Sequence, residues 1–322
     1  MAEAAGGQPL PGSGMSVEER RQALFHETPL ETAERVALGV AWLSMPARWP
    51  ELPPLMQLLA RHLVAGSADL PDPQATVGKS RMAGTVKDLT VPTLIEAYKR
   101  GLHSAGHFGT LRWESPPERC VLFFDEYHLS KRLRRTMRQG RYTVTFDRDF
   151  EGVIKACAER RTGKWHVTWI TPRIMHAYAA LFDAGYVHSF EVWNEKDELV
   201  GGGYGVALGR IFFTESQFSR EDNTSKLGFS VLNWHLARWG YILNDGKDAT
   251  PTILDMGFRV IPRGEFLRHL AHGTPSGGKP GRWQVETSVD VVAEWKPGDK
   301  SPATAPDHGA SSAPTAGFAK AS

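Results

Sequence analysis

The sequence has almost no cysteine, and that scarcity excludes several classes of protein. Only Cys120 and Cys157 occur among 322 residues, far apart and outside any C-x-x-C or Cys/His cluster. A disulfide framework and a structural zinc site are therefore excluded, and we expect neither a metal nor a cofactor. This use of cysteine is typical of proteins in the reducing cytoplasm.

Long apolar runs and an excess of one charge are also missing. Charged residues interrupt every apolar stretch before the roughly 18–20 residues that a membrane span requires. Lys and Arg total 38 against 36 Asp and Glu, which excludes a generally polybasic protein and makes any nucleic-acid contact local. The opening segment MAEAAGGQPLPGSG lacks the basic start and apolar stretch of a secretory signal. We expect a cytoplasmic monomer that does not bind membranes.

The composition that remains, 41% hydrophobic and 23% charged, is that of an ordinary globular protein. We predict a disordered leader over 1–15 and a helix-rich N-terminal domain over 16–128. A second domain over 129–272 and a largely disordered tail over 273–322 follow. From Lys296 onward the tail offers almost nothing apolar to bury. The preceding segment WQVETSVDVVAEW is expected to add one strand at most.

Helical patterns dominate the first third of the chain. Thr28, Pro29 and Glu31 form a capping box with a first-turn proline, which predicts a helix through about Met45. Two more helices are expected, one after Pro53 and Pro54 and one from 92 to 100.

From Tyr142 onward strands and helices alternate. SFEVWN, ELVGGGYGVALG and RIFFTESQF are predicted as successive strands, followed by a helix over about 224–239 and the strand YILND. This order is typical of an α/β (α+β) acyltransferase domain of the GNAT kind, with a central, mostly antiparallel sheet.

One predicted helix, HLSKRLRRTMRQGR, carries the densest positive charge in the chain. Six basic residues and no acid lie between Lys131 and Arg141. Such a helix suits a phosphodiester backbone, although a solvated helix face is the usual explanation of a charge run. The residues we assign to nucleic-acid contact are Lys131, Arg132, Arg134, Arg135 and Arg138.

Eight motifs together resemble the leucyl/phenylalanyl-tRNA-protein transferase family in order and spacing, over rather more than half of the chain. They are VPTLIEAYKRGL, RWESPPERCVLF, HLSKRLRRTMR, DFEGVIKACAERR, TWITPRIMHAYAALFDAGYVHSFEVW, ELVGGGYGVALGRIFF, ESQFSREDNTSK and IPRGEFLRHL. The resemblance implies transfer of Leu or Phe, with Met a further candidate, from aminoacyl-tRNA to an N-terminal Lys or Arg of a protein. That reaction marks the acceptor protein for degradation as an N-degron.

The resemblance also implies roles for particular residues. Glu215 matches the glutamate of the family's G-E-S-M-F-S and would bind the cationic acceptor, and Asp245 matches the aspartate of L-I-D-C-Q and would assist proton transfer. Trp113 and Trp169 match tryptophans near the donor's terminal adenosine, although core packing explains them nearly as well. The apolar pocket for the transferred side chain would be lined by Gly203, Phe212, Phe229, Leu232 and Leu236, which bland core packing explains equally well.

Departures from the family pattern fall at the site itself. Lys247 replaces the glutamine two residues after the aspartate, where its charge would either stabilise an oxyanion or pair with Asp245 and disable it. Gly203 replaces a pocket methionine, which would enlarge the pocket. The chain is therefore interpreted as a divergent member of the family.

Three alternatives stay open. The first is a related transferase that modifies a small amine or a different N-terminus, and the second is a catalytically silent homologue that only binds. A CoA-dependent acetyltransferase comes last, because Glu221 and Asp222 lie where the pyrophosphate would be held.

Overall fold

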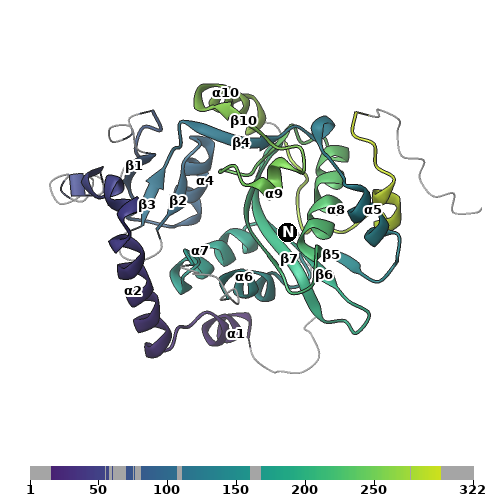
Figure 1. Ribbon diagram of the computed structural model, residues 1–322, viewed down its shortest axis with the longest axis horizontal. Helices are drawn as coiled ribbons and strands as arrows, with labels where there is room; N and C mark the ends of the chain where they lie inside the picture. The colour runs from purple at the N-terminus through teal and green to yellow at the C-terminus, as the bar shows by residue number, and fades with distance from the viewer. Residues whose placement is uncertain are drawn as a thin grey trace, which may run out of the picture.

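The computed structural model describes residues 16–54, 56–57, 60, 70–74, 76, 81–106, 111–159, 168–275 and 277–298 (Figure 1). The predicted leader, residues 299–322 and most of the predicted helix after Pro54 lie outside these residues. In the described part of the chain, no helix has both the length and the apolar character that crossing a membrane requires.

The N-terminal part begins with helices α1 (Val17–Leu24) and α2 (Pro29–Ser44), the 3-10 helix η1 (Pro46–Glu51) and, later, α4 (Val91–Lys99). The predicted capping box at the start of α2 is confirmed. The Glu31 N–H donates to the Thr28 hydroxyl at 3.2 Å, and the Thr28 N–H donates to the Glu31 carboxylate at 2.8 Å. This part also contains a three-stranded sheet in the order β1 (Met82–Thr85), β3 (Arg112–Glu114), β2 (His103–Ala105).

A seven-stranded sheet forms the centre of the molecule. Its order is β10 (Arg259–Pro262), β4 (Glu118–Leu122), β9 (Leu243–Asp245), β8 (Ile211–Ser219), β7 (Leu199–Leu208), β6 (Val187–Trp193) and β5 (Thr143–Phe146). Only β8 and β9 pair in parallel, so the prediction of a mostly antiparallel central sheet is confirmed. However, β4 precedes residue 128, so the predicted domain boundary does not separate this sheet from the N-terminal part.

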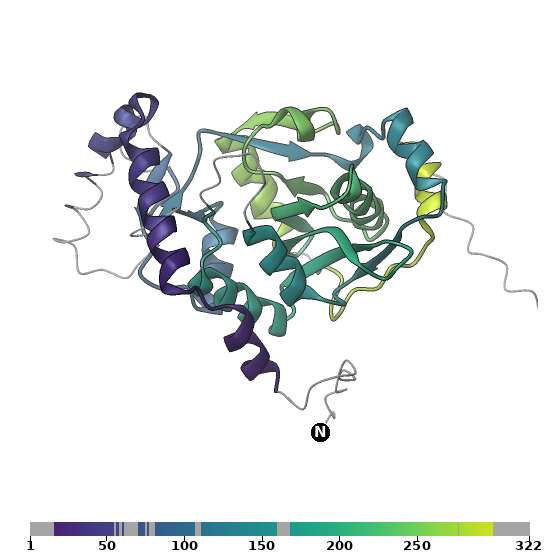
Figure 2. The same cartoon turned by 60° about the horizontal axis from the view of Figure 1, so that its bottom comes forward.

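Helices cover both faces of the large sheet (Figure 1). On one face, α6 (Phe150–Ala158) and α7 (Pro172–Asp183) pack over a core that continues to α4. On the other face, α8 (Thr224–Arg238) contributes its apolar side chains to a second core cluster. The 3-10 helix η2 (Phe124–Glu126) and helices α5 (Lys131–Met137), α9 (Pro251–Leu254), α10 (Arg263–Gly273) and α11 (Val289–Ala293) complete the domain. Figure 2 shows α2 and α5 on opposite sides of the molecule, as does Figure 1.

The segment over 277–298, which we call the C-terminal strap, is ordered and does not fit the predicted disordered tail. Trp283 is 1% exposed and stacks on His188 with ring centroids 3.6 Å apart, and Val292 and Ala293 are buried. Where one strand was expected, the strap forms the short helix α11. The Arg134 side chain donates to the carbonyls of Ala293 and Trp295, which fixes α11 beside α5. A few buried apolar side chains thus anchor a segment whose composition had indicated disorder.

Candidate active site

A cleft opens where two neighbouring strands separate. The parallel pairing of β8 with β9 runs only from Ile211↔Leu243 to Phe213↔Asp245. Beyond that point β8 continues along β7, whereas the segment after β9 stays along β4, where the Gly246 N–H donates to the Cys120 carbonyl at 2.8 Å. The cleft between them has a volume of about 850 Å³ and is lined by residues of β8, of β2, of the segment after β9 and of the start of α8.

Glu215 projects from a bulge in β8. Tyr204 of β7 pairs with Ser216 and Gly205 pairs with Thr214, which leaves Glu215 as the extra residue between them. Bulges re-aim side chains and are common next to active sites. The predicted strand RIFFTESQF is confirmed, since β8 continues past Glu215 to Ser219, and the Glu215 side chain lines the cleft.

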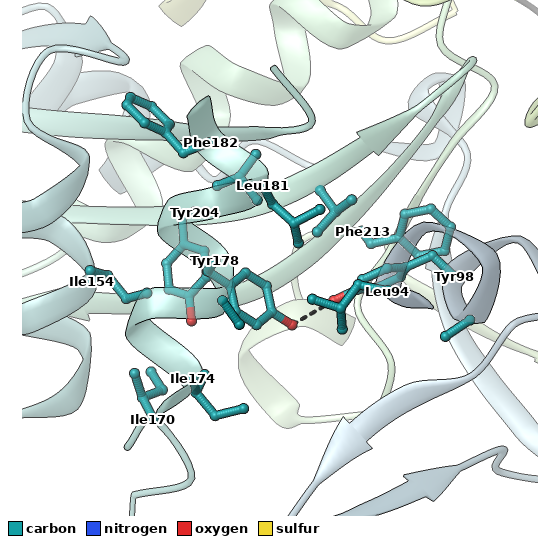
Figure 3. Packing of buried hydrophobic residues seen from close by; sticks show 14 of the residues in the cluster. Leu94, Tyr98, Ile154, Ile170, Ile174, Tyr178, Leu181, Phe182, Tyr204 and Phe213 are labelled. Carbon is teal, nitrogen blue, oxygen red and sulfur yellow. Dashed lines mark hydrogen bonds between the residues drawn. The ribbon is translucent and has the colours of Figure 1, made fainter. Parts of the chain in front are cut away.

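Two tyrosines hold the Glu215 carboxylate. The Tyr98 hydroxyl donates to Oε1 at 2.6 Å and the Tyr178 hydroxyl to Oε2 at 3.1 Å. The two hydroxyl oxygens lie 2.6 Å apart, and Figure 3 shows this bond between α4 and α7. Burial, with the nearby Glu215 charge, raises the pKa of both tyrosines well above the usual value. Both therefore stay neutral donors to an ionised carboxylate. Sequence reasoning missed both tyrosines, because a tyrosine in an amphipathic helix looks like a core residue.

The side chain of Lys247 pairs with Glu215 and not with Asp245. Its Nζ forms an ion pair with Glu215 Oε2 and donates to the carbonyl of Thr214 at 3.2 Å. Its backbone is left-handed, with a φ of 63°, and its N–H donates to Asp245 Oδ1 at 2.9 Å. Of the two predicted outcomes, pairing with Asp245 is wrong. The reason is that the Asp245 carboxylate accepts a hydrogen bond from the backbone N–H of Lys247, while the left-handed turn directs the Lys247 side chain toward β8.

Asp245 ends β9 as predicted, but it is fully buried and does not line the cleft. Its carboxylate accepts from Arg119, through Nε to Oδ1 at 3.2 Å and through Nη2 to Oδ2. Arg119 is 1% exposed and also donates to the carbonyl of Gly101 at 3.2 Å. Because the pair is bidentate, it fixes the carboxylate that holds the Lys247 turn. Sequence reasoning missed Arg119, because nothing in the sequence around it indicates that it pairs with a buried carboxylate.

His103 extends the same network toward the opposite wall. Its Nδ1 accepts from Arg119 Nη1 at 3.1 Å, and its Nε2 lies 3.8 Å from Glu114 Oε2. Burial, together with Arg119, lowers the pKa of His103 well below its usual value, so the ring is neutral. Glu114 in turn accepts from Arg112 at 2.7 Å and pairs with Arg81. The cleft is thus lined by paired charges of both signs.

The structure brings only one of the two predicted tryptophans to the cleft. Trp169 lines it and meets Tyr178 edge-on, with ring centroids 6.1 Å apart. Trp113 lies on β3 and is buried in the first core cluster, away from the residues that line the cleft. Its packing matches the alternative of core packing.

The predicted side-chain pocket is not part of this cleft. Four of its residues lie in the second core cluster, on the α8 face of the sheet, and none lines the cleft: Phe212, Phe229, Leu232 and Leu236. A side chain at Gly203 would come within 2.6 Å of the Ser216 carbonyl oxygen and 2.8 Å of the Phe190 ring. Glycine is therefore required there by the close approach of the neighbouring strands, so it does not enlarge a pocket.

The basic helix α5 lies beside the strap, and no residue of it lines the cleft. Arg134 is engaged by strap carbonyls, and Arg138 donates to Glu294 at 2.7 Å. Arg132 is exposed and lies 4.0 Å from Asp222, while Lys131 and Arg135 are exposed as well. Four of the five predicted contact residues are thus exposed, three on α5 and Arg138 at its C-terminal cap.

Neither a metal site nor a strong argument against CoA emerges from the geometry. Among the described residues, no group of three or more His, Cys, Asp and Glu side chains is placed to hold a metal ion. At the start of α8, Ser225 and Lys226 line the cleft. Glu221 does not line it, because its carboxylate accepts from Tyr142 at 2.7 Å and Asn194 at 3.3 Å. The predicted repulsion of a pyrophosphate by Glu221 is therefore weaker than the sequence suggested.

Comparisons with known proteins cover the same part of the chain. The family model described as leucyl/phenylalanyl-tRNA protein transferase matches residues 121–271, which include Glu215, Asp245 and Lys247. Proteins named leucyl/phenylalanyl-tRNA--protein transferase are similar to the chain. The one from Pseudomonas syringae pv. syringae (strain B728a) is 47% identical over 185 residues, which is 57% of this chain and 80% of the relative. The one from Azotobacter vinelandii is 46% identical over 188 residues, which is 58% of this chain and 81% of the relative. Identity at this level over four fifths of a relative, together with a family match that includes Glu215, Asp245 and Lys247, places the chain in the leucyl/phenylalanyl-tRNA-protein transferase family.

Proposed function

We propose that the chain transfers an aminoacyl group from aminoacyl-tRNA to the N-terminal amine of a protein or peptide. The observation that carries the proposal is the 47% identity to a named transferase over 185 residues, which is 80% of that relative. Leucyl and phenylalanyl groups are the donors that the relatives' names specify, and methionyl is a further candidate. The product would be an N-degron, a protein marked for degradation. Monomeric action in the cytoplasm is part of the proposal, and two buried free cysteines support the cytoplasmic location.

The proposed reaction needs a group that binds the acceptor and a way to handle its proton. The incoming amine must lose a proton, and the ester carbonyl passes through a tetrahedral intermediate. Glu215 lines the cleft together with Glu114 and Asp248, and it is assigned to the acceptor because it is the one that matches the family's glutamate. Asp245 lies behind the cleft wall, so we assign it and Arg119 to positioning the turn at Lys247. Trp169 lines the cleft, so we assign it to stacking on the terminal adenosine of the donor.

The tRNA body would lie against the exposed face of α5. Lys131, Arg132 and Arg135 present their charges to solvent there, as phosphate contacts require. Arg134 and Arg138 are assigned an indirect role at the same surface, because they bind the C-terminal strap and so fix it beside α5.

The test is transfer of radiolabelled Leu, Phe and Met from their tRNAs to model peptides that begin with Lys, Arg or Ala. We expect transfer by the wild type and at least a 100-fold loss in the isosteric variant Asp245→Asn, whose folding is checked by circular dichroism. Transfer from none of the three tRNAs would overturn the proposal. Binding of aminoacyl-tRNA without turnover would indicate a silent homologue, and transfer of acetyl from acetyl-CoA would indicate the last alternative.

A further inference from the structure

The carboxylate assigned to the acceptor is already neutralised by the chain's own lysine. Glu215 has a side chain that is only 1% exposed, and Lys247 Nζ sits against its Oε2 inside the cleft. The Tyr98 and Tyr178 hydroxyls approach the same carboxylate. A carboxylate has about four lone-pair sites, and three donors already address them here.

The backbone holds Lys247 in that place. The Asp245 carboxylate fixes its N–H at 2.9 Å, and the Thr214 carbonyl accepts from its Nζ at 3.2 Å. Because Asp245 is locked by Arg119, the turn has little freedom to swing the lysine away. The ammonium therefore occupies the position that a basic acceptor side chain would take beside Glu215.

We propose that Lys247 is a specificity-determining residue that acts as an internal competitor for the acceptor's cationic side chain. The inference deepens the proposed function and rests on it. A peptide that begins with Lys or Arg must displace Lys247 or bring a second cation to one carboxylate, which like-charge repulsion opposes. A neutral first side chain makes neither demand. The chain therefore selects N-termini whose first side chain is uncharged. With a neutral residue at position 247, Glu215 would be free to bind the cationic side chain of a basic acceptor.

The test compares two peptides that differ only at the first residue, Lys in one and its uncharged isostere norleucine in the other. The measurement is kcat/KM for aminoacyl transfer with each peptide, for the wild type and for Lys247→Gln, Lys247→Met and Lys247→Arg. We expect the wild type to use the norleucine peptide at least as well as the Lys peptide. The ratio of Lys to norleucine should rise at least tenfold in Lys247→Gln and Lys247→Met, mainly through KM. It should stay at the wild-type value in Lys247→Arg, which keeps the cation.

Lys196→Gln is the matched control, because it removes one lysine charge from an exposed turn outside the cleft. Its ratio should equal that of the wild type. A wild-type ratio above ten, or a ratio that both neutral variants leave unchanged, would overturn the inference. Each ratio is taken within one protein, so a partial loss of folding cancels.

A second measurement needs no variant. The Lys peptide is added as a competitor while the wild type transfers to the norleucine peptide. We expect an inhibition constant at least as large as the KM of the norleucine peptide, and tenfold tighter inhibition would contradict the inference. Absence of transfer to either peptide by every variant would instead count against the proposed function.

Discussion

Two buried polar clusters in this molecule compensate their buried carboxylates in different ways. The cleft cluster consists of His103, Arg119, Glu215, Asp245 and Lys247, and both of its carboxylates face a cation. The strap cluster consists of Asp147, His188, Glu191 and Trp283, at the other end of the sheet. Its Glu191 is bonded mainly by neutral groups, with the Ser189 hydroxyl at 2.5 Å and the Thr145 hydroxyl at 2.6 Å.

The difference follows from what each cluster has to do. In the strap cluster, the Trp283 ring stacks on His188 and the Trp283 backbone N–H donates to Asp147, so the strap covers the cluster. Without a cation, burial raises the pKa of Glu191 to about 7. In the cleft cluster, Lys247 and Arg119 offset the cost of burying Glu215 and Asp245. Ion pairs thus hold the carboxylates of the cleft cluster, whereas neutral hydrogen bonds hold Glu191 in the strap cluster.

The largest expected effect comes from breaking the Arg119–Asp245 pair. Asp245→Ala should lower the free energy of unfolding by about 3–5 kcal/mol, because it leaves the Arg119 guanidinium buried without a counter-charge. Arg119→Met should cost a similar amount for the converse reason. The double variant Arg119→Met/Asp245→Ala should cost much less than the sum of the single changes. Urea unfolding of the four proteins measures this coupling.

Glu126→Ala serves as the control for that series. Its partner is Arg259, and both side chains are more than two fifths exposed, so we expect a loss below about 1 kcal/mol. Additive losses for the Arg119–Asp245 series would show that the pair is not the unit that holds the cleft.

The second prediction concerns the pH dependence of stability in the strap cluster. The pKa of Glu191 is about 7 in the folded chain, above its ordinary value of 4.5, so between these values the folded chain holds a proton that the unfolded chain has lost. Its stabilising contribution is complete below pH 4.5 and is lost as the pH rises through 7. We expect the wild type to lose up to about 3 kcal/mol of unfolding free energy relative to Glu191→Gln over this window. Glu195→Gln, on an exposed turn, should show no such difference. Parallel curves for the wild type and Glu191→Gln would refute the account of this cluster.

The same contrast explains what the sequence could predict. Periodicity and caps predicted α2, α7, α8 and the meander of β6, β7 and β8, because local patterns encode those elements. They did not predict that β4 joins the large sheet, since strand pairing is non-local. Motif resemblance identified Glu215, Asp245 and Lys247 but not their partners. Tyr98, Tyr178 and Arg119 are brought to these residues by tertiary packing, and no local pattern distinguishes them from core residues.

The smallest expected effect concerns α5, which packs beside the strap and does not line the cleft, and the measurement tests whether α5 binds tRNA phosphates. Each phosphate contact contributes about 0.9 to the slope of log K against log salt concentration for duplex nucleic acid. Lys131→Gln/Arg135→Gln should therefore reduce the slope for aminoacyl-tRNA binding by up to about 1.8, measured by filter binding at several salt concentrations. Arg134→Gln should leave the slope unchanged and instead loosen the strap, because its guanidinium is engaged by the carbonyls of Ala293 and Trp295. Lys196→Gln controls for the loss of charge alone. If the double variant and this control share one slope, α5 is a solvated helix face, and the tRNA must reach the cleft along another surface.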